Sequence, residues 1–405
     1  MSYRLLTIVL WPALFLYTLK IAWRDRSMRY LRQRLGFSYK NIKSQIWIHC
    51  ASVGEVNTYI SLHKKLIEQH PDTQFLITTN TTTGAQTVER HRLLNTKHCY
   101  LPIEAAGAIK RFLNTAQAEQ CLIMETELWP LLYSQCAKRC IPITIINARL
   151  SHKTLNAHHW IKSRYKESLE KVERILCKSA EELEHYQQLG ARSEQLEVAG
   201  NLKFASAAGA NKMQPIELNQ RRYWLAASTH NNEEQQLAET WQRINNNELL
   251  VIVPRHPNRS AQIQKQLNDL NLNYAVRSKQ QPVNPDTQIY LADTLGELTG
   301  FIAGAYCVFI GGSIIKHGGQ NILEPASAGK AIVCGPHMYN FTEELQLLKS
   351  ANACIQVNDI GELKQTFSDL LDKPERINTL EQNAQQIMQQ QSDVLDVYLQ
   401  SLNIK

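Results

Sequence analysis

Two successive series of short apolar runs, separated by longer segments, constrain the fold of this chain more than any other feature. The runs of the first series are Gln45–Cys50, Gln74–Thr79, Cys121–Met124, Ile143–Ile146 and Arg174–Cys177. Segments long enough for helices, such as Thr58–Gln69 and Trp129–Arg139, lie between them. Strands that alternate with helices predict a parallel sheet that is covered on both faces.

The second series follows a break in the pattern near Gly200. The residues after the break, 206–211, are small and polar, which is typical of a linker. The runs of this series are Tyr223–Ala227, Leu249–Val253, Gln288–Leu291, Cys307–Ile310, Ala331–Cys334 and Cys354–Val357. The tail from about Glu362 is rich in glutamine and has helical spacing, so we interpret it as packing helices. A chain of 405 residues with this pattern predicts two Rossmann-like α/β domains.

Composition and motifs exclude several classes of protein. Hydrophobic residues at 43% and charged residues at 20% describe a folded chain with a large core. The nine cysteines are scattered without a CxxC pair, which indicates reduced thiols. No HExxH or similar spacing supports a metal site held by the protein. The chain also lacks GxxxxGK[ST] and GxGxxG, so a P-loop NTPase or a standard dinucleotide enzyme is excluded.

The chain begins with an apolar segment, Leu5–Leu19, that contains Pro12. A membrane-crossing helix needs about 20 apolar residues, so the segment fits a short anchor, an interfacial helix or a buried first helix. A cleaved signal peptide is disfavoured because the positive charges follow the apolar run. Those basic residues, opposed only by Asp25, are Lys20, Arg24, Arg26, Arg29, Arg32 and Arg34. With a net charge of +7, they predict contact with an anionic surface, and on the cytoplasmic side they would keep the remaining chain in the cytosol.

Glycines cluster after one strand of the second series. Gly311-Gly312-Ser313 follows Cys307–Ile310, and Gly318-Gly319 precedes a helix-like segment that contains Glu324. Glycines let the backbone approach a phosphate closely, and a helix start offers unpaired N–H groups to an anion. We interpret the segment as a nucleotide pocket in which Glu324 faces the sugar. A strand followed by an ordinary glycine turn and a capped helix explains the pattern equally well.

Three glutamates of the first half follow predicted strands, at the edge where open α/β sheets bind ligands, and one lysine precedes the linker. Glu55 could act as a general base, although Ser52-x-x-Glu55 has capping-box spacing and the spacing alone favours the cap. Glu125 and Glu127 end a strand, where one could act on a reacting group while the other caps the next helix. Lys203 precedes the linker. Its cation could stabilise charge on a departing phosphate, or it could be an ordinary solvated lysine of the hinge.

The second half places further candidates at the same kind of edge. Arg255 follows a strand and can form charge-assisted bonds to a phosphate or a carboxylate. Thr294-Leu295-Gly296-Glu297 opens a predicted helix, but its spacing is again that of a capping box.

Taken together, these motifs are similar to those of the 3-deoxy-D-manno-octulosonic acid (Kdo) transferases of Gram-negative lipopolysaccharide synthesis. The match spans nearly the whole chain, including the apolar N-terminus followed by arginines. The matching motifs are Ser52–Glu55, Glu125–Pro130, Asn147–Ser151, Gly200–Phe204, Ser228–His230, Pro254–Pro257 and the glycine segment with Asn321 and Glu324.

The resemblance implies an α/β GT-B fold, in which two Rossmann-like doubly wound domains face a central cleft, with an N-terminal membrane-associated helix. The expected parts are a hydrophobic anchor and basic segment (1–38), an acceptor-binding domain (39–205), and a nucleotide-sugar-binding domain with the terminal packing helices (206–405). The implied activity is inverting transfer of Kdo from CMP-Kdo to a lipid A precursor (lipid IVA) with release of CMP. Implied partners also include anionic inner-membrane lipids, and the catalytic domains would lie on the cytoplasmic side of the inner membrane. Neither nucleic acid, cofactor nor protein-bound metal is expected.

Carried over by motif, Glu55 resembles the family's proton acceptor, and Glu125 and Lys203 resemble positions that stabilise the transition state. The positions that match the family's CMP pocket are Pro254, Arg255, Leu295, Gly296, Glu297, Asn321, Ile322, Leu323 and Glu324. The chain departs from the family pattern at Ala292, where a glycine is usual, and at Asn231-Asn232, where a glycine and an acidic residue are usual. The alternatives are a GT-B transferase or epimerase for another nucleotide sugar, or a membrane-associated nucleotide-sugar binding protein without catalysis.

Overall fold

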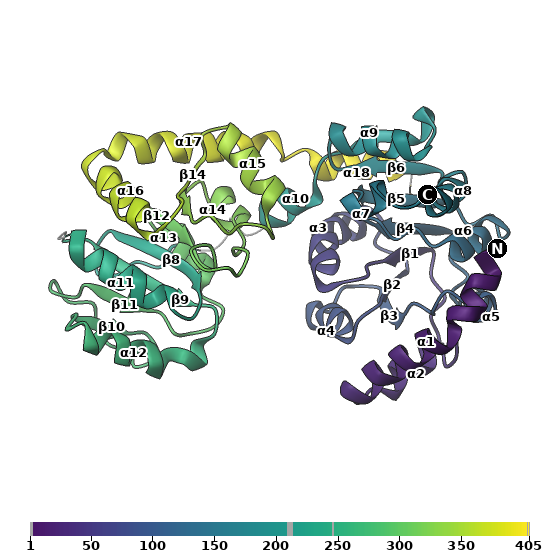
Figure 1. Ribbon diagram of the computed structural model, residues 1–405, viewed down its shortest axis with the longest axis horizontal. Coiled ribbons are helices and arrows are strands. Elements are labelled where there is room, and N and C mark those ends of the chain that lie inside the picture. Colours follow the sequence, from purple (N-terminus) through teal and green to yellow (C-terminus); the bar gives the residue numbers. More distant parts are fainter. Residues whose placement is uncertain (1–2, 209–213, 245–246, 403, 405) are drawn as a thin grey trace. The chain divides into compact units, whose positions relative to one another are not determined.

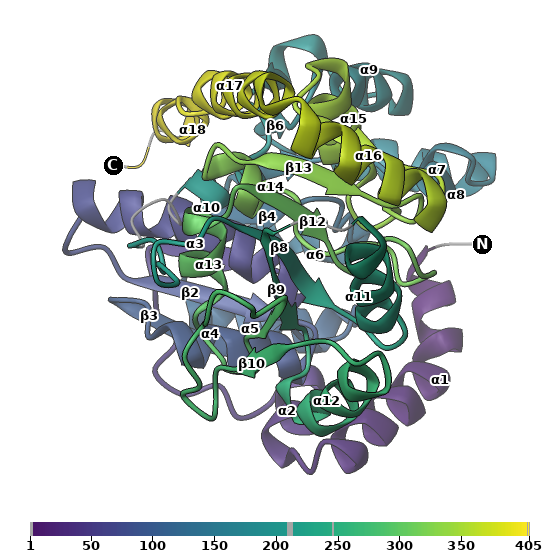
Figure 2. The same ribbon diagram turned by 90° about the vertical axis from the view of Figure 1, so that its left-hand side faces the viewer.

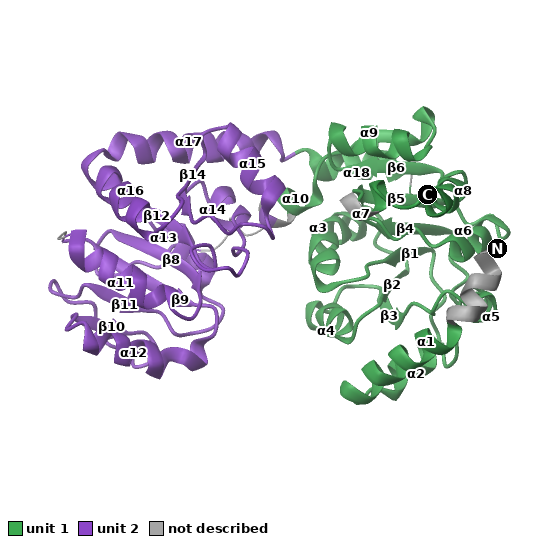
Figure 3. Ribbon diagram, in the orientation of Figure 1, with its two compact units in different colours: residues 1–206, 393–405 green, residues 207–392 purple. Residues whose placement is uncertain are grey.

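The computed structural model describes residues 3–208, 214–244, 247–402 and 404, which form two compact units (Figure 3). Unit 1 consists of Met1–Ser206 and Asp393–Lys405, and unit 2 of Ala207–Ser392. The assignment of the whole tail to the second domain is therefore wrong. Val394, Tyr398 and Leu402 of the last helix are buried in a core of unit 1. The predicted linker at 206–211 lies partly outside the described residues.

Unit 1 contains a parallel sheet of seven strands in the order β3-β2-β1-β4-β5-β6-β7 (Figure 1). Its strands are β1 (Ile46–His49), β2 (Phe75–Thr79), β3 (Thr96–Tyr100), β4 (Gln120–Met124), β5 (Ile143–Ala148), β6 (Arg174–Cys177) and β7 (Leu196–Val198). Its helices are α1 (Tyr3–Arg24), α2 (Met28–Arg34), α3 (Val53–Gln69), α4 (Thr82–His91), α5 (Ala106–Ala116), α6 (Pro130–Ala137), α7 (His152–Leu155), α8 (His159–Leu169), α9 (Ala180–Leu189), α10 (Leu202–Ala208) and α18 (Val394–Leu402). α10 runs into the first residues of unit 2.

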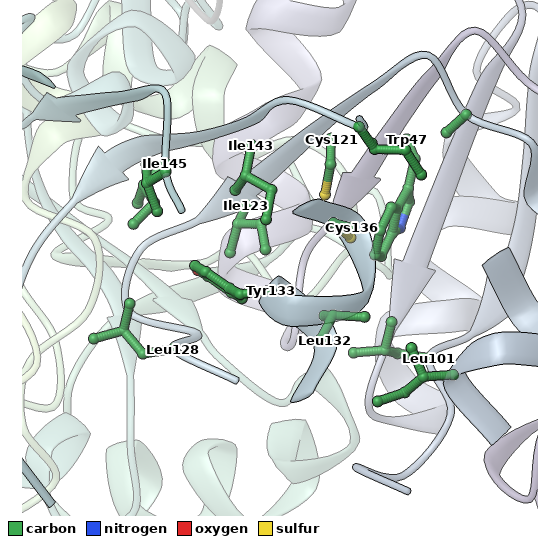
Figure 4. Close-up of a cluster of buried hydrophobic side chains, with 14 of the residues drawn as sticks. Trp47, Leu101, Cys121, Ile123, Leu128, Leu132, Tyr133, Cys136, Ile143 and Ile145 are labelled. Atoms are coloured by element: carbon green, nitrogen blue, oxygen red, sulfur yellow. The ribbon is translucent and has the colours of Figure 1, made fainter. Parts of the chain in front are cut away.

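Helices cover both faces of this sheet. In Figure 1, α3 and α4 lie on one side of β1 to β3, and α5 and α6 lie on the other. The core on the α5 and α6 side is built around Trp47, Phe112 and Tyr133. Figure 4 shows part of this core, including Tyr133 and Cys136 of α6 and Ile123 of β4. The opposite face packs Val56 and Tyr59 of α3 together with Tyr398 of α18. Burial on both faces explains why the interior strands are almost continuously apolar.

Unit 2 repeats the architecture with a parallel sheet in the order β10-β11-β9-β8-β12-β13-β14. Its strands are β8 (Tyr223–Thr229), β9 (Leu249–Pro254), β10 (Tyr274–Val276), β11 (Ile289–Leu291), β12 (Cys307–Ile310), β13 (Ala331–Cys334) and β14 (Cys354–Gln356). Its helices are α11 (Glu233–Ile244), α12 (Ser260–Asp269), α13 (Leu298–Gly304), α14 (Leu323–Ser327), α15 (Thr342–Ser350), α16 (Ile360–Asp372) and α17 (Pro374–Gln390). Figure 2 shows α11 and α12 on one side of β8 and β9 and α13 on the other. The predicted α/β fold with two doubly wound domains is confirmed.

Three strands were missed by the sequence analysis, and all three lie at the outer edge of a sheet: β3, β7 and β10. β3 reads TKHCY and keeps three of its residues partly or fully accessible, while β7 and β10 have only three residues each. An edge strand is covered on fewer sides, so its sequence carries a weaker apolar signal.

The N-terminal helices pack against unit 1 through a small cluster that contains Ala22, Tyr30, Ala85 and Tyr100. Within the described part of the chain, we find no helix with the length and apolar character that crossing a membrane requires. The large apolar side chains exposed on α1 are Trp11, Leu14, Leu16, Tyr17, Leu19 and Trp23.

Three of the six N-terminal basic residues form ion pairs or hydrogen bonds within the protein. Arg24 pairs with its neighbour Asp25, with 2.6 Å between Nε and Oδ1. Arg29 donates to Glu89 at 3.2 Å and to the His98 carbonyl at 2.6 Å. Arg34 donates to the Asn80 side chain at 2.8 Å and to the Leu101 carbonyl at 2.6 Å. The prediction that all six face an anionic surface is therefore wrong for Arg34, whose donors hold α2 against the sheet.

Candidate functional site

The carboxyl edge of the unit 1 sheet collects the charged residues predicted from the first half of the chain. β1 leads into Ser52 and Glu55 at the start of α3, β4 leads directly into Glu125, and β5 is followed by Arg149. These strands are neighbours in the order β1-β4-β5. Parallel strands end at the same edge, so residues far apart in the sequence come together there.

Glu55 is 9% exposed and does act in the cap of α3. Its Oε2 accepts the Ala51 N–H at 2.8 Å, and its Oε1 accepts the Ser52 hydroxyl at 2.9 Å. Ser52 is the N-cap residue and accepts the Glu55 N–H at 3.3 Å. The prediction that Ser52 and Glu55 form a cap of α3 is therefore correct, but it does not exclude a chemical role for Glu55.

The electrostatic surroundings of Glu55 are those of a group that exchanges protons near neutral pH. Burial raises its pKa to about 8, and the nearby charge of Glu125 adds to the effect, against the hydrogen bonds from Ala51 and Ser52. A carboxyl group whose pKa lies near the working pH is suited to general base catalysis.

Glu125 is 9% exposed and has a left-handed backbone with φ 58°. An ion pair with Arg149, with 2.7 Å between Nε and Oε2, holds its side chain. The hydroxyl of buried Tyr186 donates to the Glu125 carbonyl oxygen at 3.3 Å. A residue other than glycine in this conformation costs roughly 1 kcal/mol or more and is often found at functional sites.

Glu127 does not cap α6, contrary to one interpretation of the paired glutamates. Glu104 does so instead, because its Oε1 accepts the Leu131 N–H at 2.7 Å. Glu127 accepts the indole N–H of Trp129 at 2.6 Å, and its Oε2 lies 3.7 Å from His49 Nε2. Burial opposes ionisation of Glu127, but His49 and Trp129 outweigh it and lower its pKa. Glu127 is thus a fixed acceptor that orients Trp129.

Lys203 lies in the first turn of α10, the helix that follows β7. Asn147 accepts the Leu202 N–H at 3.0 Å and so joins the start of α10 to the end of β5. The hydroxyl of Tyr398 accepts the Asn147 N–H and donates to the Gly200 carbonyl, both at 3.0 Å. The C-terminal helix therefore helps to build this edge. No local signal predicts that, because Tyr398 lies 251 residues from Asn147.

In unit 2, the backbone donors of the glycine segment are taken by a side chain of the protein. Glu233 accepts the N–H groups of Gly312, Ser313 and Ile314 at 2.6, 3.1 and 3.2 Å, and that of His230 at 3.0 Å. The interpretation that these amides hold a phosphate is therefore wrong for Gly312 to Ile314. Asn232 adopts φ 72°, a left-handed conformation that glycine and asparagine tolerate best.

A pocket of about 310 Å³ lies beside this segment, and ordinary small-molecule sites start at about this size. The predicted residues Arg255, Asn321 and Glu324 line it. So do Ser228 and Gln320, which stand in the quoted motifs but had no role assigned. Burial raises the pKa of Glu324, against a hydrogen bond from Asn321 and the charge of Arg255. Arg255 supplies the positive charge of the pocket.

The remaining predicted CMP-pocket positions are not part of this lining as far as the structure describes it. Ile322 and Leu323 are buried at 0% and 2% exposure. Pro254 ends β9, while Leu295 is 80% exposed. Glu297 is held by Arg277 at 2.6 Å and by the Thr294 hydroxyl, and the hydrogen bond from Arg277 lowers its pKa.

Among the residues that the structure describes, no group of three or more histidine, cysteine or acidic side chains is arranged to hold a metal ion. The charged groups described above are glutamates, with Arg149 and Lys203 in unit 1 and Arg255 in unit 2.

The family model and the similar curated proteins identify the same family for this chain. The family model described as "3-Deoxy-D-manno-octulosonic-acid transferase (kdotransferase)" matches residues 29–206. A 3-deoxy-D-manno-octulosonic acid transferase of Haemophilus influenzae is 33% identical over 367 residues, which cover 86% of this chain and 86% of that protein.

One solved structure of low sequence identity shares the fold of this chain. The UDP-GlcNAc 2-epimerase of Neisseria meningitidis superimposes with a TM-score of 0.60 at 12% identity, covering 88% of this chain and 99% of that one. This likeness shows a shared fold only. The C-terminal CMP-Kdo binding domain of WaaA from Acinetobacter baumannii is 32% identical, with a TM-score of 0.41, and covers 46% of this chain and 97% of that domain.

Proposed function

Because the chain belongs to the family of 3-deoxy-D-manno-octulosonic acid (Kdo) transferases, we propose that it transfers Kdo from CMP-Kdo to a lipid A precursor, with Glu55 as the base. Glycosyl transfer of Kdo in lipopolysaccharide synthesis follows from the family itself. The acceptor and the roles of individual residues are the proposed part.

The assignment of Glu55 rests on its position at the carboxyl edge of the unit 1 sheet, 9% exposed in the first turn of α3, where burial and the Glu125 charge raise its pKa to about 8. In the proposed step, an acceptor hydroxyl oxygen bonds to the anomeric carbon of Kdo, and its proton passes to Glu55. The bond between that carbon and the phosphate oxygen breaks, and its electron pair leaves with CMP. A single displacement of this kind inverts the anomeric centre. A carboxylate of raised pKa is a stronger base than an ordinary one, which favours the proton transfer.

Glu125 and Lys203 are proposed to stabilise the transition state. The ion pair with Arg149 and the hydrogen bond from Tyr186 hold Glu125 in one place, which supports a positional role. The cation of Lys203 would oppose charge on the departing phosphate.

The donor is proposed to bind in the pocket of unit 2. Arg255 would contact the phosphate of CMP, because the amides of Gly312, Ser313 and Ile314 are already satisfied by Glu233. Glu324 would accept hydrogen bonds from the ribose hydroxyls. CMP is a good leaving group, so we also propose that transfer needs no resident metal.

We further propose that α1 and the basic residues after it hold the enzyme on the cytoplasmic face of the inner membrane. The exposed apolar side chains of α1 support this proposal, and so do the exposed Lys20, Arg24, Arg26 and Arg32. Flotation of the full chain with vesicles that contain anionic lipid tests it. Vesicles that fail to bind the chain at low salt would contradict it.

The catalytic proposal is tested by incubating the protein with CMP-Kdo and tetra-acylated lipid A precursor and measuring the products by mass spectrometry. We expect a glycolipid heavier by Kdo, and CMP. The variant Glu55→Ala should lose transfer and still bind CMP, whereas Glu68→Ala, at the exposed end of the same helix, should retain both. Full transfer by Glu55→Ala would exclude Glu55 as the base, and CMP binding without turnover by the native protein would favour a binding protein.

A further inference from the structure

A second pocket of about 310 Å³ in unit 1 has no role in the mechanism above. One wall is the segment Thr126–Pro130, which directly follows Glu125, and the other wall is α8. Its location ties it to the reaction, because Glu127 in this wall also contributes to the electrostatic surroundings of Glu55.

Aromatic rings form much of this pocket: Trp129 on one wall, and Trp160 and Tyr165 on the other. The hydrogen bond from the Trp129 indole to Glu127 fixes the orientation of that ring. Glu127 is itself held by His49 and by Asn80, whose Nδ2 lies 3.5 Å away. Preoriented aromatic faces suit the apolar face of a sugar ring, whose hydroxyl groups lie at its rim.

Arg164 brings a positive charge to the same pocket. Its Nη1 donates to Glu167 at 2.7 Å, and its guanidinium lies 6.0 Å from the centre of the Trp160 ring. Its Nε is shielded from water and has no hydrogen-bond partner among the described residues. A guanidinium carries five N–H donors in a planar fork that matches the oxygens of a phosphate.

We propose that this pocket binds a phosphorylated sugar ring of the acceptor, with Trp129 and Trp160 against the ring and Arg164 on the phosphate. The proposal rests on the function proposed above, whose acceptor is a phosphorylated amino-sugar lipid. The pocket then sets which hydroxyl group of the acceptor reaches Glu55, so it determines acceptor specificity and not donor binding.

The test compares the acceptor KM of Trp160→Ala, Trp160→Phe and Arg164→Ala, with CMP-Kdo saturating and bisphosphorylated lipid IVA as the acceptor. We expect Trp160→Ala to raise the acceptor KM about tenfold and Trp160→Phe to restore most of the affinity. Arg164→Ala should raise it by about 10- to 100-fold. The KM for CMP-Kdo should stay unchanged in all three variants. Lys162→Ala removes a positive charge from the same helix outside the pocket and should behave like the native protein.

Acceptors that lack either the 1- or the 4′-phosphate identify the contact. The effect of Arg164→Ala should vanish with one of the two and persist with the other. An equal effect on both would overturn the phosphate contact, and unchanged acceptor KM values in Trp160→Ala and Arg164→Ala would overturn the whole inference. Absence of Kdo transfer by the native protein would instead count against the proposed function. Thermal melting of each variant separates a binding defect from a folding defect.

Discussion

The variant Glu55→Gln should be less active and, at neutral and alkaline pH, more stable than the native protein. Burial and the Glu125 charge raise the pKa of Glu55 from 4.5 to about 8. The native state therefore holds this proton more tightly than the unfolded state does, and the stability of the native protein falls as the pH rises from 4.5 to 8. At pH 7 the native state keeps Glu55 mostly protonated, whereas the unfolded chain ionises it, and this difference costs about 3 kcal/mol of stability. Glutamine does not ionise, so the variant escapes this penalty.

Part of this gain in stability is offset, because only one of the two terminal atoms of glutamine can accept a hydrogen bond. The bonds from Ala51 and Ser52 use different oxygens, so about 1 kcal/mol is lost. The net gain at pH 7 is about 2 kcal/mol, or about 4–8 °C in Tm for a unit of this size. Below pH 4.5 the gain disappears and the loss remains, so the variant should be less stable than the native protein by about 1 kcal/mol.

Thermal melting at pH 4.5, 7 and 8.5 measures this difference, with Glu68→Gln on the exposed end of α3 as the control. The control should show no pH-dependent change relative to the native protein. Transfer by Glu55→Gln should fall by at least about 1000-fold if Glu55 is the base. A Tm difference that stays constant from pH 4.5 to 8.5 would refute the raised pKa, even if activity is lost.

The other predictions concern the surroundings of these carboxylates. Glu125→Gln removes a charge that raises the pKa of Glu55. The pH at which kcat/KM reaches half its plateau should therefore fall by roughly one unit, in addition to any loss of rate. An unchanged pH profile would show that the Glu125 charge does not affect the pKa of Glu55. Glu233→Gln can no longer accept four backbone N–H groups, and we expect denaturant unfolding to show a loss of about 3 kcal/mol in unit 2; native stability would contradict that role. Tyr398→Phe leaves buried groups of Asn147 and Gly200 without their partner, so the Tm should fall by an amount equivalent to about 1–3 kcal/mol, whereas an unchanged Tm would mean that water replaces the hydroxyl. Transfer activity should survive dialysis against EDTA, and a loss restored by a divalent cation would contradict the proposed metal-independent reaction.

The sequence predicts every interior strand and the edge strand β14, but it misses the other three edge strands. The interior strands carry uninterrupted buried residues, as in LLVIVP of β9, because both faces are covered. The edge strand β3 has no such run. The position of α18 was predicted wrongly for a different reason. Its apolar spacing shows that it packs, but not whether Tyr398 reaches unit 1 or unit 2.

The candidate site was predictable where a residue follows a strand directly. Glu125 and Arg255 do so, and the sheet order places them at the carboxyl edges. The role of the glycine segment was not predictable, because the ligand of its amides is Glu233, about 80 residues earlier in the sequence. Glycine at 311 is needed because a Cβ there would lie 2.3 Å from the Ser228 carbonyl oxygen. Close backbone packing therefore explains this glycine without a phosphate.

Two glutamates with the same local spacing show that a sequence motif does not determine the pKa of its carboxyl group. Ser52-x-x-Glu55 and Thr294-x-x-Glu297 each place a hydroxyl three residues before a carboxyl group, and in both the hydroxyl donates to it. Burial and Glu125 raise the pKa of Glu55 to about 8, whereas the hydrogen bond from Arg277 lowers the pKa of Glu297. Burial is the larger cause for Glu55 and the Glu125 charge adds to it, while Arg277 is the main cause for Glu297, and no local pattern contains the burial or either neighbour. A base is therefore distinguished from a structural carboxylate by the burial and the charges that the fold imposes on it, and replacing Arg277 with a neutral residue should raise the pKa of Glu297 without making it catalytic.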